Sequence, residues 1–181
     1  MALTKLNYTG QGTVPSAKMP TDSVIQVKQS IKTDTTSSSS TSFEDVAGLS
    51  VNITPTSTSS KILVTVNFCW SAAVNASPKF KLAGGNSTTF VGDAAGNRQR
   101  VSYMAADDYF NGATNAGQET AFMGSIQYLD SPASTSQQTY KLQAETDGNG
   151  NYYINRTHAD VNDAAEGGRS ASSIIAMEIK G

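Results

Sequence analysis

The sequence has few of the residues that cross-link small proteins or bind metals. Its 181 residues include one cysteine, Cys69, and one histidine, His158. One cysteine cannot form an internal disulfide, and the two residues together supply too few ligands for a structural zinc or iron–sulfur site. The chain is therefore neither a disulfide scaffold nor a zinc-finger or iron–sulfur protein, and we expect no bound metal and no cofactor.

Charge and long apolar runs are also scarce. Charged residues make up 15% of the chain, and 13 basic residues against 15 acidic ones leave a net charge of −2. Such a chain offers no basic field to nucleic acid or to an anionic membrane. The most apolar stretch, residues 62–74, is interrupted by polar residues, and the N-terminus lacks the apolar core of a signal peptide. We expect a soluble protein that binds neither nucleic acid nor membranes.

What the sequence does contain is alternation of apolar and polar residues with a period of two, which predicts an all-β protein. The clearest strand is Lys61–Val74, where the residues from Ile62 to Trp70 at even positions share one apolar face. We predict about nine or ten half-buried strands. The others are Ser23–Ile31 (apolar at Ile25, Val27 and Ile31), Leu49–Ile53, Phe80–Leu82, Thr88–Val91, Gln99–Ala105, Thr120–Leu129, Thr139–Ala144, Tyr152–Thr157 and Ser173–Ile179 (Ser173, Ile175, Met177 and Ile179 on one face).

Turn-forming segments rich in Gly, Asn, Pro and Ser separate these strands, for example 83–86, 92–97 and 147–151. Many short strands joined by such turns predict one domain over residues 23–181, an antiparallel β-sandwich of jelly-roll type. The strands are too many for a seven-stranded immunoglobulin-type sandwich.

Residues 1–22 differ from the rest because they combine prolines and glycines with little apolar content. Such a segment cannot bury enough surface to order itself. We predict an extended N-terminal arm that packs on a neighbouring subunit or another assembly, and the alternative is a terminus without a partner. The predicted anchors are Leu3, Leu6, Tyr8, Val14 and Met19.

Catalytic motifs are lacking. His158 has no accompanying nucleophile motif, and we predict a surface-loop histidine. We predict that Cys69 is an inert packing thiol on the strand face opposite Phe68 and Trp70. The segment from Asp147 to Asn151 begins like a calcium loop but lacks its later glycine and glutamate, so we predict a tight hairpin turn.

Acidic residues could pair as in a glycosidase. The available carboxylates are Asp107, Asp108, Glu119, Glu145 and Asp147. Their number is ordinary for this length, and we predict a protein that is not an enzyme. Two aromatic pairs, Tyr109–Phe110 and Tyr152–Tyr153, flank polar loops and are candidate contacts for a glycan, unless alternation turns one ring of each pair into the core.

Residues 1 to about 66, from ALTKLNYTGQGTVPSAKMP through the Thr/Ser-rich run to SSKILV, resemble a module of virion proteins of tailed phages that infect cyanobacteria and marine bacteria. The segments GNRQRVSYMA, FMGSIQYLDSPAS and SSIIAMEIKG continue the resemblance less sharply. The resemblance implies a β-sandwich that forms homotrimers, either at the distal tips of tail fibres and tailspikes or as a capsid cement protein.

The module begins at Met1 and fills the chain, which favours the cement protein over the fibre tip. The expected function is therefore a trimeric capsid decoration protein on the outer surface of a phage virion, bound to the major capsid protein or other virion proteins. The alternative is a receptor-binding tip of a tail fibre or tailspike that recognises a host surface polysaccharide. The low charge of the strand faces, with small outward-facing residues such as Thr65, Ser71, Ser102 and Ser125, also predicts close packing between copies in a compact homotrimer.

Overall fold

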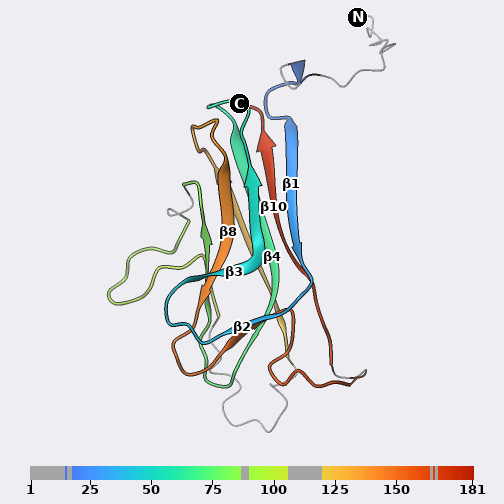
Figure 1. The fold of residues 1–181 in the computed structure, drawn as a ribbon. Coiled ribbons are helices and arrows are strands. Elements are labelled where there is room, and N and C mark those ends of the chain that lie inside the picture. Colours follow the sequence, from blue (N-terminus) through green and yellow to red (C-terminus); the bar gives the residue numbers. More distant parts are fainter. Residues whose placement is uncertain (1–14, 16–17, 87–89, 106–119, 164, 166) are drawn as a thin grey trace, which may run out of the picture.

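The computed structural model describes residues 15, 18–86, 90–105, 120–163, 165 and 167–181, and the described chain folds as antiparallel β-structure (Figure 1). The strands are β1 (Val24–Lys32), β2 (Thr36–Ser38), β3 (Glu44–Ile53), β4 (Lys61–Ala72), β5 (Lys79–Ala83), β6 (Tyr103–Met104), β7 (Phe122–Asp130), β8 (Gln138–Glu145), β9 (Tyr152–Ile154) and β10 (Ser172–Ile179). Within this part of the chain no helix is long and apolar enough to cross a bilayer.

The strands form two sheets. Sheet A has the order β1-β10-β4-β9-β2, with β7 paired to the other edge of β4, and sheet B has the order β3-β8-β5-β6. A single cluster of buried apolar side chains includes residues from both sheets. This arrangement is consistent with the predicted β-sandwich.

The alternation predicted for the longest strand is confirmed in β4. Ile62, Val64, Val66 and Phe68 are fully buried and point into the core. Each such side chain contributes roughly 1.5–3 kcal/mol by leaving water. Toward the end of β4, Phe68 packs on Phe80 of sheet B with ring centroids 4.7 Å apart, so this strand ties the two sheets together.

For β1 and β10 the predicted core face is wrong, because the opposite set of residues is the one that faces the core. In β10 the buried residues are Ser172, Ile174, Ala176 and Glu178, whereas the set from Ser173 to Ile179 lies on the opposite, outer face of sheet A. In β1, Val27 and Ile31 are more than half exposed. Each face of these two strands carries both apolar and polar residues. The period of two therefore predicts a strand, but it does not predict which of the two faces is buried.

The inner face of β1 can carry polar residues because the backbone of an irregular part of β3 lies close to it and accepts a hydrogen bond from it. β3 changes register between Asp45 and Ser50, and Gly48 there has a φ of 84°. A side chain at Gly48 would begin 3.4 Å from the Cβ of Lys32, and the Ser30 hydroxyl donates to the Gly48 carbonyl at 3.0 Å. The backbone of β3 at Gly48 thus covers the end of β1, and the stem of the buried Lys32 packs against it.

Other differences concern short strands. β2 lies in the Thr/Ser-rich run that was not predicted as a strand, and of the predicted strand 99–105 only β6 forms. In the predicted strand 88–91, residues 90 and 91 are not in a strand, and residues 88 and 89 lie outside the described part. Short strands depend on pairing partners that a local pattern does not contain.

Candidate interaction surface

The outer face of sheet A has an open half built from β1, β10, β4 and β7, which we call the open face. The strand register aligns its side chains in rows across the four strands. One row is Val27, Met177, Leu63 and Leu129, the next is Gln29, Ile175, Thr65 and Gln127, and the third is Ile31, Ser173, Asn67 and Ser125. With Ile179 at the end of β10, these thirteen residues define the surface.

The open face combines exposure with a complete lack of charge. Val27 is 55% exposed, Ile31 59% and Leu129 46%. None of the thirteen residues is ionisable, although 15% of the chain is charged. Lys61, which pairs with Ile179, bounds the face at one end. Antiparallel sheets usually carry polar and charged residues on a solvated face, so an uncharged outer face on which seven of thirteen residues are apolar is typical of a contact surface.

Hydrogen bonds between neighbouring strands order the polar side chains of the open face. The Ser125 hydroxyl donates to Oδ1 of Asn67 at 2.9 Å, and Nε2 of Gln127 donates to the Thr65 hydroxyl at 3.3 Å. Cross-strand pairs of this kind stabilise a sheet. They also hold the face in one conformation.

The other half of the same sheet face is covered by the segment that follows β9. The N–H of Asn155 donates to the Cys69 carbonyl at 3.0 Å, and the Ser71 hydroxyl donates to the Arg156 carbonyl at 2.8 Å. Cys69 lies opposite Phe68 and Trp70 as predicted, and it is buried. Ser71 lies on the outer face as predicted, but it is buried beneath this segment, so the prediction that it packs against another copy is wrong.

The side chain of Asn155 fastens this segment to the sheet. Its Nδ2 donates to the carbonyls of Lys32 and Asp34, both at 2.9 Å, and its Oδ1 accepts from Ser172 at 2.5 Å. The φ of Asn155 is 63°, a left-handed conformation that asparagine tolerates better than most residues. The segment is therefore part of the fold, and the open face ends where the segment begins.

The aromatic candidates for glycan binding are not open to solvent where the structure describes them. Tyr152 is 0% exposed and Tyr153 8%. Tyr153 stacks on His158 with ring centroids 5.4 Å apart, and the Arg156 guanidinium lies 4.1 Å from its ring centre. Burial of both rings, in the core and under the covering segment, contradicts a stacking role for them. Tyr109 and Phe110 lie outside the described residues.

His158 is less exposed than a free loop histidine. It stacks on Tyr153, and its Nδ1 is buried without a hydrogen-bond partner. No serine or cysteine nucleophile shares a hydrogen bond with it among the contacts of the described residues. The ring packs the covering segment against β9.

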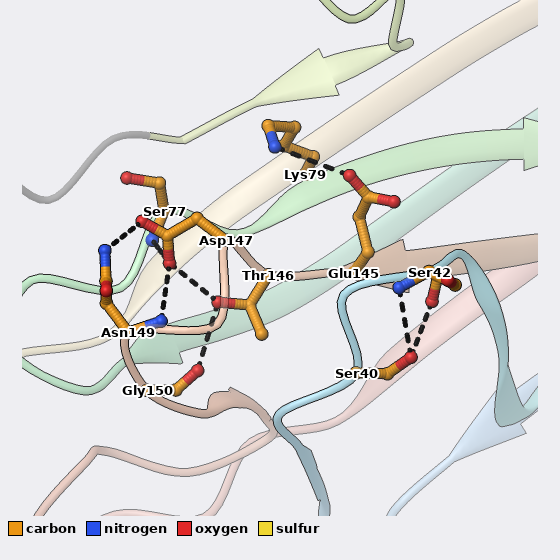
Figure 2. Close-up of polar contacts among 9 residues, drawn as sticks. All are labelled: Ser40, Ser42, Ser77, Lys79, Glu145, Thr146, Asp147, Asn149 and Gly150. Atoms are coloured by element: carbon orange, nitrogen blue, oxygen red, sulfur yellow. Dashed lines mark hydrogen bonds and ion pairs between the residues drawn. The ribbon is translucent and has the colours of Figure 1, made fainter.

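Asp147 holds a tight turn, as Figure 2 shows. Its Oδ1 accepts from the N–H groups of Asn149 (3.1 Å) and Ser77 (3.2 Å), and its Oδ2 accepts from Nδ2 of Asn149 (2.8 Å). Burial raises the pKa of Asp147, but these donors outweigh it and the net pKa is lowered. The turn is not a hairpin, because β8 belongs to sheet B and β9 to sheet A.

The other predicted carboxylates do not form a described catalytic pair. Glu145 is buried and pairs with Lys79 on the neighbouring strand at 3.4 Å, also visible in Figure 2. Asp107, Asp108 and Glu119 lie outside the described residues. Across the described residues, no three His, Cys, Asp or Glu side chains gather as metal ligands.

Two buried carboxylates at one end of the core could not be recognised from the sequence. Asp130 on β7 accepts from the Tyr140 hydroxyl at 2.6 Å and from the N–H of Asn86 at 3.1 Å, both at Oδ2. Burial, followed by the bond to Asp130, raises the pKa of Tyr140 far above its usual range. Oδ1 of Asp130 is buried without a partner. Nothing in the turn sequence 130–134 distinguishes this aspartate from a solvated one.

Glu178 on β10 is the second buried carboxylate. It accepts from the N–H and hydroxyl of Thr56 at 2.6 and 2.7 Å and from Nε2 of Gln26 at 3.0 Å. Burial raises the pKa of Glu178, but the bonds from Thr56 and Gln26 outweigh it, so that the net pKa is lowered. The group is a structural anion held by neutral donors.

Of the predicted arm anchors, only Met19 lies in the described part, where it is half-buried and its carbonyl accepts from Nζ of Lys180. Leu3, Leu6, Tyr8 and Val14 lie outside the described residues. The base of the arm is fixed, since the N–H of Asp22 donates to the Lys180 carbonyl and that of Lys180 to the Ser23 carbonyl.

The sequence matches no protein-family model and no curated protein. The functional role of the chain must therefore be inferred from the open face and the contacts around it.

Proposed function

We propose that this chain is a non-enzymatic structural protein of a phage virion, a homotrimeric cement protein on the outer surface of the capsid. The observation that carries the proposal is the open face. An uncharged surface with a complete row of exposed apolar side chains is a liability on an isolated monomer, whereas it is what a permanent contact between proteins needs.

The topology supports the jelly-roll part of the proposal. From β2 to β9 the chain passes to the other sheet after almost every strand. Repeated crossing between two antiparallel sheets is typical of Greek-key and jelly-roll sandwiches. Such folds build capsid and other virion proteins, in agreement with the resemblance of residues 1 to about 66.

The titratable groups support a structural role. Asp147 holds a turn, Glu145 pairs with a lysine, and Glu178 and Asp130 fix the end of the core. Carboxylates whose lone pairs serve the fold are poorly placed for acid–base chemistry. The alternative, a glycan-binding fibre tip, is weakened by the burial of Tyr152 and Tyr153.

The proposal is tested on capsids of the phage that encodes the chain. Purified chain is added to capsids that lack it, and bound protein is quantified by mass spectrometry against the major capsid protein. We expect saturation at a fixed ratio to the capsid protein over the whole shell. Binding at a few tail positions per particle would favour the fibre tip, and no binding would contradict a virion role.

A further inference from the structure

We infer that the open face is covered by a second copy of this chain. The inference rests on the proposed function, because it assigns one surface of the proposed trimer to the contact between subunits. Under this inference, parts of the molecule other than the open face contact the capsid shell.

The distribution of charge favours a copy of the same chain over a different protein. Where identical subunits meet around a symmetry axis, a charged residue near the axis approaches its own copy, and like charges in close contact are destabilising. The thirteen residues of the open face include no ionisable group, and Lys61 stands only at its end. A different partner would more often be selected by charge complementarity, which this face cannot provide.

The polar residues of the open face are suited to pair with themselves. Asn67, Gln29 and Gln127 carry both a donor and an acceptor, and so do the hydroxyls of Thr65, Ser125 and Ser173. Oδ1 of Asn67 accepts from Ser125 within the same subunit, which leaves Nδ2 of Asn67 as a donor to a neighbouring copy. Any such group can therefore bond to the same kind of group on another copy.

The dimensions fit the centre of a subunit contact. Four strands about 4.8 Å apart and side-chain rows about 6.8 Å apart along each strand give the face a plan area of roughly 400 Å². This is about half of the roughly 800 Å² that each partner buries in a standard interface. The face supplies the apolar centre, and the rim falls on the surrounding elements.

The test places one charge on the open face. Val27→Glu adds a carboxylate in the first apolar row, where the exposure of Val27 lets the monomer tolerate it. Val74→Glu is the matched control, since Val74 is also exposed (36%) and lies in the loop after β4, away from the face. Mass is measured by light scattering with size-exclusion chromatography, and folding by circular dichroism.

We expect the wild type and Val74→Glu to have about three times the chain mass of 19.0 kDa, and Val27→Glu to have that mass alone. If Val27→Glu fails to fold, Gln127→Glu places a charge on the same face at an exposed polar position and is expected to give the same loss of assembly. A folded Val27→Glu or Gln127→Glu that keeps the wild-type mass overturns the inference, and so does a monomeric wild type.

The inference and the proposed function can fail separately. A chain that assembles through the open face but never binds capsids retains the inference and overturns the capsid role. A chain that saturates capsids as a monomer, and loses this binding in Val27→Glu, overturns the inference in favour of the shell as occupant.

Discussion

At the scale of single residues, Tyr140 and Asp130 join the two sheets. Tyr140 stands on β8 of sheet B and Asp130 on β7 of sheet A, and their 2.6 Å hydrogen bond is buried. A side chain at Gly85 would begin 2.0 Å from the Asp130 carboxylate, so the adjoining turn accepts only glycine. The packing here depends on atoms that are far apart in the sequence.

We predict that Tyr140→Phe lowers the free energy of unfolding by roughly 2 kcal/mol, because it leaves a buried carboxylate with one donor fewer. Urea unfolding measures the change. Tyr103→Phe is the control, since Tyr103 contacts the core through its ring and none of the hydrogen bonds of the described residues involves its hydroxyl, so its effect should be clearly smaller. Equal stability of Tyr140→Phe and wild type would show that the bond contributes nothing net.

Residue patterns predicted the local contacts well and the distant ones poorly. The turn at Asp147 could be predicted because its partner Asn149 is two residues away. The burial of Asp130 and Glu178 could not, because their donors come from other strands and loops. One set of local contacts was also missed, since nothing in the sequence indicates that Arg156 and His158 fold back over the ring of Tyr153.

At the scale of elements, the ring of a β4 phenylalanine can lie over β7 because the β7 residue beneath it has no side chain. Gly124 on β7 pairs with Phe68 on β4, and a Cβ at Gly124 would lie 2.3 Å from Cζ of the Phe68 ring. Phe68 is fully buried and packs on Phe80, so its ring has little room to move.

We therefore expect Gly124→Ala to destabilise the fold by roughly 1–3 kcal/mol through overpacking. Gly92→Ala is the control, because no atom lies within 4 Å of a Cβ at Gly92. Thermal unfolding of the two variants beside the wild type measures the difference. A Gly124→Ala protein as stable as Gly92→Ala would mean that the Phe68 ring adapts freely.

The elements also show why the open face could not be recognised from the sequence. Strand positions were largely predictable, since β1, β4, β5, β7, β8 and β10 all fall on predicted alternations. For β1 and β10 the larger apolar residues form the outer set, while the core set contains Lys32, Ser172 and Glu178. An outer face with many apolar residues has the same sequence pattern as a core face, and only the pairing of strands into sheets distinguishes the two.

At the scale of the whole molecule, the lowered pKa values predict loss of stability in acid. Bonds from Thr56 and Gln26 outweigh the effect of burial and lower the pKa of Glu178 below its ordinary value of 4.5, and the hydrogen bonds from Lys141 and Gln143 lower that of Asp45. A carboxylate with a lower pKa in the folded state stabilises the fold above its unfolded pKa. This contribution disappears as the pH falls through the folded value.

We expect the melting temperature to change little from pH 7 to about pH 5 and to fall below about pH 4.5. In Glu178→Gln the melting temperature at pH 7 should be lower and the decline in acid shallower, because one of the responsible groups is absent. Calorimetry across this pH range measures both. A Glu178→Gln variant with an unchanged acid decline would show that other groups dominate it.

The fixed base of the arm has a mechanical consequence. Asp22 and Ser23 bond to Lys180, so the chain enters β1 and leaves β10 at one end of sheet A, visible at the top of Figure 1. A force that pulls the start of β1 away from the end of β10 would break the hydrogen bonds between these antiparallel strands one after another, and not all together. Tension applied at these two points is thus borne by one pair of residues at a time, whereas pressure spread over a sheet face is shared by every strand beneath it.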